Sequence, residues 1–253
     1  MQNKNKTVVK SMKLLDLFRT NWKLSLNEIV ELSGIPKTSV HRMLGSLEDM
    51  GLLHKDHEGK YTLGMLFLEF GQLVADRLDM RQLAYPMMKE LRDEIGEAVN
   101  LTMIDNMEAI YIEKLDTLHP VRLYTKVGRR SPLYAGACSR IILAHLPESE
   151  IETYLKETEL KPIGIGTITD KQKLRTVLQQ SKLDGYTISY SELEDHTSSV
   201  AAPIFDYTNK VVGGLSIAGP DVRFPKEHVP HIIEKVKRTA AEISQKLGYS
   251  NQK

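Results

Sequence analysis

Polar and cationic side chains crowd the start of an expected helix in the segment IPKTSVHRMLGSLEDMGLL, residues 35–53 of this 253-residue chain. Ammonium, hydroxyl, imidazole and guanidinium groups placed in this way donate to base edges and phosphates in a DNA major groove. At helical spacing the apolar residues fall on the other face, which has to pack against a domain core. The polar face holds Lys37, Thr38, His41, Arg42 and Gly45, and the apolar face holds Val40, Met43, Leu44, Leu47 and Met50. This arrangement is typical of a recognition helix and indicates a gene regulator.

Signals on the N-terminal side of this helix complete a helix-turn-helix. Pro36 suits the first position of the recognition helix, and Gly51 suits its end. Ser25 and Glu28 form a capping box that starts a preceding short helix. Gly34 supplies the tight turn between the two helices.

Two further elements indicate a winged domain. A helix over residues 7–20 would complete a three-helix core, with Val8, Met12, Leu15 and Phe18 pointing inward. Residues 52–56 and 60–63 alternate around a turn at Glu58-Gly59, which predicts a hairpin, or wing, after the recognition helix. Lysines on this wing are placed to reach phosphate. The expected DNA-binding residues are Ser25, Lys37, Thr38, Ser39, His41, Arg42, Lys55 and Lys60.

Charge gives modest support to this prediction. Residues 1–64 hold ten Lys and Arg against seven Asp and Glu, a net charge of +3, in a chain whose formal net charge is +1. One unit with so little charge makes few phosphate contacts. Double-stranded operator DNA should therefore be bound by a dimer or a larger assembly.

Composition limits what the rest of the chain can be. Roughly 170 residues remain, enough for a second domain. Cys138 is the only cysteine, which excludes an internal disulfide and a multi-cysteine metal site. The sequence shows neither an apolar run of membrane-spanning length nor a signal-peptide pattern. We expect a cytoplasmic protein with no membrane partner, no cofactor and no metal.

The join between the two parts is expected to be helical. Residues 64–79 carry a broad apolar stripe made of Leu66, Phe67, Phe70, Leu73 and Val74. A second helix follows, kinked or turned at Pro86 and ended by Gly96, with Leu83, Met87, Leu91 and Ile95 inward. We expect a DNA-binding domain at 1–64, a linker helix at 65–79 and a second domain at 80–253. A second copy of the chain is the expected partner of the stripe.

The remaining sequence predicts an α+β domain with a largely antiparallel sheet. Strands are expected in two groups of three, with a block of helices between them and one closing helix. The first group is 98–105, 108–116 and 121–127, with a hairpin turn at Asn106-Met107. The helices are 138–146, 148–157 and 170–183, the second group of strands is 186–192, 199–205 and 211–218, and the closing helix is 226–247.

The chain resembles the IclR family of bacterial transcription regulators over nearly its whole length. Eight segments carry the resemblance, in the order expected for the family. They are residues 35–53, YTLG at 61–64, GE at 96–97, VGRRSPLYA at 127–135, TIT at 167–169, GY at 185–186, VAAPIFD at 200–206 and LSIAGP at 215–220. The resemblance implies a winged helix-turn-helix, a linker helix and a GAF-like domain that binds a small effector. It also implies dimers, often paired into tetramers, on palindromic operators.

The resemblance further implies an effector site on one face of the sheet. The aligned positions are Leu123, Ser131, Ala137, Cys138, Ser189, Ser199, Ser216 and Ala218. This chain departs from the family pattern at several of them. Cys138-Ser139-Arg140 replaces a small residue followed by Gly-Lys, Ser189 replaces an acidic residue, Ser199 replaces a frequent cysteine, and His196 replaces a frequent glycine.

Chemically, these residues describe a site for a small organic acid. A helix opening at Ala137 to Ser139 offers backbone N–H groups to a carboxylate. The serines Ser189, Ser199 and Ser216 donate and accept hydrogen bonds, which suits hydroxyl or keto groups. A sugar acid or keto acid is the expected effector, although strand serines satisfied by backbone remain an alternative. Cys138 is expected to be a buried small residue rather than a redox sensor.

The same residues bear on the direction of regulation and on an enzymatic alternative. A repressor is expected, because blocking a promoter requires only binding, and activation of a catabolic operon with an aromatic acid as effector is the alternative. An enzyme has little support, since GIGTIT at 164–169 lacks a P-loop ending and is expected to be a surface loop. Ser216 is not in a nucleophile elbow, and the eight histidines show no ligand spacing.

Overall fold

The computed structural model describes residues 5–75, 79–123 and 125–250. It divides into two compact units, Met1–Arg77 and Leu78–Lys253, which are described separately. The three-segment division at 64 and 79 remains a prediction.

The first unit is a winged helix-turn-helix. Its elements are α1 (Lys6–Asp16), a 3-10 turn (Leu17–Arg19), β1 (Leu24–Ser25), α2 (Leu26–Ser33), α3 (Lys37–Asp49), β2 (Leu53–Lys55), β3 (Lys60–Leu63) and α4 (Leu66–Ala75). The three strands form an antiparallel sheet in the order β1-β3-β2. The capping box at Ser25 and Glu28 and the left-handed turn at Gly34 are both present, as the sequence predicts.

The core of this unit differs in detail from the prediction. Leu14, Leu15 and Phe18 are buried, whereas Val8 and Met12 are exposed. Helix α1 therefore packs on the core at Leu14 and Leu15, near its C-terminal end, and the predicted inward positions Val8 and Met12 do not contribute to the core. On α4 the apolar side chains Met65, Phe67, Leu68, Phe70 and Leu73, beginning just before its first residue, are exposed within the single chain.

The second unit is an α+β domain built on one antiparallel sheet. Its strands are β4 (Ala98–Asp105), β5 (Glu108–Leu115), β6 (Arg130–Pro132), β7 (Thr187–Tyr190), β8 (Thr197–Phe205) and β9 (Val211–Pro220). Their order is β6-β5-β4-β9-β8-β7, and every pairing is antiparallel. The two central strands, β4 and β9, thus come from opposite ends of this unit.

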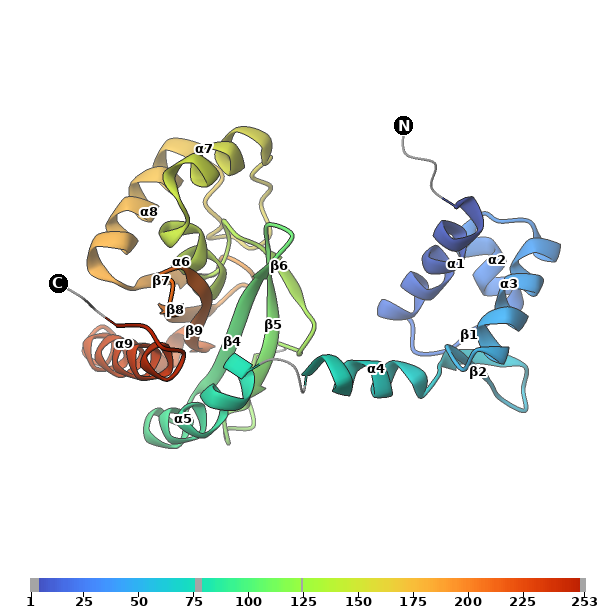
Figure 1. The fold of residues 1–253 in the computed structure, drawn as a ribbon, viewed down its shortest axis with the longest axis horizontal. Helices are drawn as coiled ribbons and strands as arrows, with labels where there is room; N and C mark the ends of the chain where they lie inside the picture. The colour runs from blue at the N-terminus through green and yellow to red at the C-terminus, as the bar shows by residue number, and fades with distance from the viewer. Residues whose placement is uncertain (1–4, 76–78, 124, 251–253) are drawn as a thin grey trace. The chain divides into compact units, whose positions relative to one another are not determined.

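Helices cover both faces of the sheet (Figure 1). They are α5 (Asp79–Ile95), α6 (Ala137–His145), α7 (Glu148–Glu157), α8 (Lys171–Asp184) and α9 (Val229–Lys246), and a 3-10 turn lies at Asp221–Arg223. One core joins α6, α7 and α8 to the sheet, and a second joins α5 and α9 to its other face. The class predicted from the sequence is therefore confirmed. Pro86 lies inside α5, which continues past it.

One predicted strand is wrong. Residues 121–123 and 125–127 are not a strand, and Tyr124 lies outside the described residues. The carbonyl groups of Leu123 and Thr125 accept hydrogen bonds from the Lys114 ammonium at 3.1 and 2.9 Å. Because a side chain satisfies these groups, the segment has no need of a neighbouring strand. The third strand of the group is β6, three residues further on.

Candidate functional site

The recognition helix presents its polar side chains to solvent. Lys37, Thr38, His41 and Arg42 are exposed, and Ser39 is half-buried. The opposite face buries Val40, Leu44 and Leu47, whereas Met43 is half-buried and Met50 is exposed just after the helix. The Lys37 ammonium donates to Asn27 Oδ1 at 3.1 Å, which orients it over the helix-turn-helix.

The wing residues are less available than the helix residues. The Lys60 ammonium lies 3.3 Å from Glu58, and Lys55 lies over the ring of Tyr61, 5.4 Å from its centroid. Hydrogen bonding from Lys23 lowers the pKa of Asp56 to about 2. The Ser25 hydroxyl accepts from the Glu28 backbone N–H as part of the capping box. Ser25 and Lys60 therefore already have partners inside this unit.

The floor of a pocket in the second unit follows from strand register. Ser189, Ser199 and Ala218 are directly paired across β7, β8 and β9, so they form one row on one face of the sheet. Two residues along, Ser216 pairs with Asn100 on β4 and belongs to the next row. The side chains of Ser189, Ser199, Ala218 and Ser216 are small, and this leaves space above this part of the sheet.

Helix α6 covers this floor. At Gly214 an added Cβ would lie 2.6 Å from the Cys138 carbonyl oxygen, so only glycine allows the helix so close to β9. Cys138 is buried, with its Sγ 3.2 Å from the Gly214 carbonyl oxygen and 3.1 Å from Thr102 Oγ1. Burial raises the pKa of this thiol to about 11. The thiol is therefore protonated at neutral pH, as is typical of a cysteine that is buried in a domain core.

The pocket has a cavity volume of about 40 Å³. Seven of the eight predicted effector residues line it, namely Leu123, Ala137, Cys138, Ser189, Ser199, Ser216 and Ala218. Ser131 does not line it, and its buried hydroxyl lies 2.7 Å from that of Ser139. The other lining residues are Asn100, Tyr111, Thr125, Arg129, Gly136, Leu193, Glu194, Thr197 and Ser198.

The Gly136 and Ala137 backbone N–H groups at the start of α6 already have partners within the chain, contrary to the prediction that they are open to a ligand. The Ala137 N–H donates to Ser189 Oγ at 3.1 Å, and the Gly136 N–H donates to Glu192 Oε2 at 2.9 Å. Ser189 in turn lies 2.8 Å from the Ser199 hydroxyl. A carboxylate and a hydroxyl of the chain itself thus take the place expected for a ligand carboxylate.

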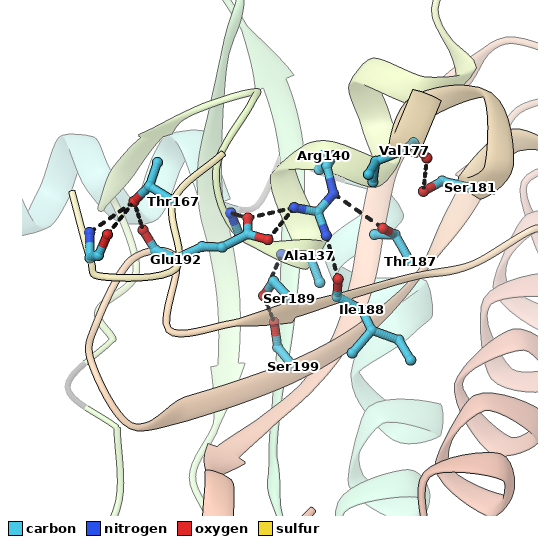
Figure 2. A network of polar contacts seen from close by, with 12 residues as sticks. Ala137, Arg140, Thr167, Val177, Ser181, Thr187, Ile188, Ser189, Glu192 and Ser199 are labelled. Atoms are coloured by element: carbon cyan, nitrogen blue, oxygen red, sulfur yellow. Dashed lines mark hydrogen bonds and ion pairs between the residues drawn. The ribbon is translucent and has the colours of Figure 1, made fainter. Parts of the chain in front are cut away.

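Glu192 is fixed there by a buried arginine. Figure 2 shows the Arg140 guanidinium between the Glu192 carboxylate and the strand β7, where it donates to Thr187 Oγ1 at 3.2 Å and to the Ile188 carbonyl oxygen. The side chains of Arg140 and Glu192 are 1% and 5% exposed. We refer to Arg140 and Glu192 as the inner pair.

A second arginine–glutamate pair lines the pocket. Arg129 Nη1 lies 2.6 Å from Glu194 Oε1, and the two side chains are 28% and 34% exposed. We refer to Arg129 and Glu194 as the outer pair. Arg129 lies in the segment VGRRSPLYA, but nothing in the sequence pairs it with Glu194, because the two residues belong to loops that only the folded sheet brings together.

Asn100 is a further residue that the sequence analysis missed. It is 3% exposed, and its Oδ1 has no hydrogen-bond partner among the described residues. An amide within the apolar strand AVNLTMID is a signal that could have identified it, since buried polar groups normally have partners.

The loop at residues 191–196, which carries both glutamates, is held from outside by the segment at 164–167. The Gly166 N–H donates to the Ser191 carbonyl oxygen at 2.8 Å, and an added Cβ on Gly166 would lie 1.9 Å from the Tyr190 carbonyl oxygen. Thr167 Oγ1 donates to the Glu192 carbonyl oxygen at 2.7 Å (Figure 2). The predicted surface loop therefore supports the pocket wall.

No group of three metal-ligating side chains is present in the part of the chain that the structure describes. No helix among the described residues has the length and apolarity needed to cross a membrane.

Comparison with known proteins agrees with both units. The model of the IclR helix-turn-helix domain matches residues 7–57, and that of the bacterial transcriptional regulator IclR C-terminal domain matches residues 72–245. The HTH-type transcriptional regulator KipR of Bacillus subtilis is 58% identical over 250 residues, covering 99% of this chain and 100% of that protein.

Solved structures show the same architecture. The crystal structure of the Thermotoga maritima IclR has a TM-score of 0.82 at 31% identity, covering 96% of this chain and 99% of that one. An IclR homologue from Microbacterium hydrocarbonoxydans, crystallised in complex with 4-hydroxybenzoate, has a TM-score of 0.84 at 24% identity and covers 97% and 100%. With a recognition helix in one unit and an enclosed polar pocket in the other, the chain belongs to the IclR family of transcriptional regulators.

Proposed function

We propose that this regulator is a repressor that binds operator DNA as a homodimer, and that a small organic acid in the pocket changes its affinity for that DNA. The acid is a sugar acid or keto acid. The DNA contacts come from Lys37, Thr38, Ser39, His41 and Arg42 on α3, with Lys55 and Lys60 of the wing and the turn at Ser25 contacting the phosphate backbone.

The observation that carries the effector part is the polar floor under α6. Ser189, Ser199 and Ser216 line one enclosed pocket together with Asn100 and Arg129. Hydroxyl and amide groups suit the hydroxyl or carbonyl groups of a small acid, and a guanidinium suits its charge. Ligand sites in proteins combine such a concave shape with a few convergent polar groups.

The exposed apolar side chains at and beside α4 support the dimer. Phe67, Phe70 and Leu73 are 36%, 52% and 52% exposed in the single chain. Contiguous apolar surface of this kind marks an interface, and a second copy also supplies the second recognition helix that a palindromic operator needs. Pairing of two such dimers would give a tetramer.

Repression is proposed because occlusion of a promoter requires DNA binding alone. The alternative is an activator whose effector is an aromatic acid. The Microbacterium homologue was crystallised with 4-hydroxybenzoate, and this acid therefore belongs among the candidate ligands.

Fluorescence anisotropy of the full-length protein on DNA from upstream of its own gene tests the proposal. Specific binding should be at least about a thousandfold tighter than binding to random DNA at physiological salt. One acid from a panel of pyruvate, lactate, gluconate and 4-hydroxybenzoate should shift it. In a reporter assay with the same promoter, deletion of the gene should raise expression, whereas a fall would indicate an activator.

Arg42→Ala tests the role of the recognition helix in the same assay. If Arg42 contacts a base, the substitution should weaken specific binding by about 1–3 kcal/mol and leave acid binding unchanged. Arg175→Ala removes the same charge from the second unit, where Arg175 pairs with Glu148 at 2.7 Å, and it should leave DNA affinity unchanged. Equal DNA affinities for the two variants would remove Arg42 from the interface.

A further inference from the structure

We propose that the negative group of the effector is bound by Arg129, in exchange for Glu194, and that Asn100 accepts a hydrogen bond from a hydroxyl or N–H of the same ligand. This inference rests on the proposed function, since it specifies how the pocket selects its acid. The N-terminus of α6 has a different role, because it binds a carboxylate of the chain itself.

The inner pair keeps a ligand carboxylate away from α6. The Gly136 and Ala137 N–H groups already donate to Glu192 and Ser189 at 2.9 and 3.1 Å. To reach the Arg140 guanidinium, 1% exposed, a ligand would have to move the buried Glu192 carboxylate away from both this guanidinium and the Gly136 N–H, which would leave Glu192 as the unpaired charge. An unpaired buried charge is strongly unfavourable, so this exchange is excluded for a small acid.

The outer pair can be exchanged at far lower free-energy cost. Arg129 and Glu194 are 28% and 34% exposed, and ion pairs that solvent reaches contribute little net free energy. A ligand carboxylate can take the place of the Glu194 carboxylate and keep the guanidinium paired through two parallel hydrogen bonds. The backbone of Glu194 is held by Thr197, whose Oγ1 donates to its carbonyl oxygen at 2.6 Å. Exchange therefore requires only that the Glu194 side chain rotate.

Asn100 supplies the second fixed point, inside the pocket. Its Oδ1 is buried and without a partner among the described residues. It lies in β4 opposite Ser216 of β9, so it belongs to the same floor as the serines. Leaving a buried acceptor unpaired costs about 1–3 kcal/mol, and a ligand that donates a hydrogen bond to it recovers this free energy.

Together the two residues define a ligand class. The ligand has one negative group for Arg129 and one O–H or N–H donor for Asn100. Hydroxy acids meet both requirements, whereas a keto acid with no donor meets only the first. Lactate carries a hydroxyl donor at the carbon where pyruvate carries a carbonyl oxygen, and lactamide lacks the charge.

Isothermal titration calorimetry of the full-length protein tests the inference with pyruvate, lactate, lactamide, gluconate, glucose and 4-hydroxybenzoate as probes. Wild type, Arg129→Gln and Glu194→Gln are compared, and their melting temperatures verify that they fold. One hydroxy acid should bind wild type, and its uncharged counterpart should not. Arg129→Gln should weaken that binding at least tenfold, and Glu194→Gln should tighten it about threefold to tenfold, because the competing carboxylate is gone.

Each outcome has a distinct meaning. An acid that binds all three proteins equally would overturn the inference and leave the proposed function intact. Tighter binding of pyruvate than of lactate would overturn the role of Asn100. If none of the acids binds wild type or Glu194→Gln, the proposed effector class fails, and the inference fails with it.

Discussion

The inner and outer pairs join the same two residue types to the same short loop, yet their surroundings give them opposite properties. Arg140 and Glu192 are 1% and 5% exposed, and every group around them is engaged. Glu194 follows Glu192 by two residues on this loop, and the side chains of Arg129 and Glu194 are about a third exposed. The inner pair is a fixed part of the fold, whereas the outer pair is available for exchange.

The free-energy cost of breaking an Arg–Glu ion pair therefore cannot be inferred from its residue types alone. Breaking a buried pair leaves a charge with neither water nor a partner, whereas breaking an exposed pair returns both charges to water. The position of the glutamate along the loop at 191–196 determines which case applies. Ligand binding is therefore expected at the outer pair, which costs less free energy to break.

The largest effect should come from the inner pair. Arg140→Ala should lower the free energy of unfolding by about 3–5 kcal/mol, because Glu192 is left buried without its counter-charge. The midpoint of urea denaturation measures this change. Arg129→Ala is the matched control and should stay within about 1 kcal/mol of wild type. Similar losses for both variants would remove the distinction between the two pairs.

A smaller effect, of opposite sign, is expected at Asn100. Asn100→Leu replaces an unpartnered buried acceptor by an apolar group of similar size, so the protein should be as stable as wild type or more stable, by up to about 1 kcal/mol. Acid binding should be weakened in the same variant. Thr102→Val is the control, since the Thr102 hydroxyl lies 3.3 Å from the Cys138 carbonyl oxygen and its loss should destabilise the fold. A clearly destabilised Asn100→Leu would mean that Asn100 supports the fold rather than the ligand.

The smallest effect concerns the other end of α6. Burial lowers the pKa of His145 below its ordinary 6.5, and its Nδ1–H donates to the Ile141 carbonyl oxygen at 2.9 Å. The unfolded chain therefore takes up a proton at a higher pH than the folded protein. The contribution of His145 to stability is complete above pH 6.5 and is lost as the pH falls through the folded pKa.

Melting temperatures of wild type and His145→Gln between pH 5 and 7.5 measure this loss. The variant has no titrating ring, so its melting temperature should fall less on acidification than that of wild type. Parallel curves would assign the acid sensitivity to groups other than His145.

The local elements could be predicted from the sequence because their signals are local. The capping box at Ser25, the turn at Gly34 and the buried face of Val40, Leu44 and Leu47 all depend on residues within a few positions of each other. The hairpin turn at Asn106 and Met107, both with positive φ, is of the same kind.

Features that depend on distant partners could not be predicted in this way. The segment at 121–127 alternates like a strand, but Lys114 satisfies its carbonyl groups. Ala137 looks like an open helix start, but Ser189 on β7 accepts its N–H. Arg129 lies in the segment VGRRSPLYA, but it meets Glu194 only in the folded domain, and for this reason the sequence did not identify the two residues as a pair.

The order of the sheet also has a consequence for folding kinetics. β4 and β9 are neighbours at its centre, and Thr102 of β4 contacts Gly214 of β9 across 112 residues of sequence. Closing so long a chain segment is slow compared with forming a hairpin. The floor of the pocket spans this junction, with Asn100 on one side and Ser216 on the other. A newly made chain can therefore bind the proposed ligand only after β4 and β9 have paired, and a ligand bound across this junction should slow the separation of the two strands on unfolding.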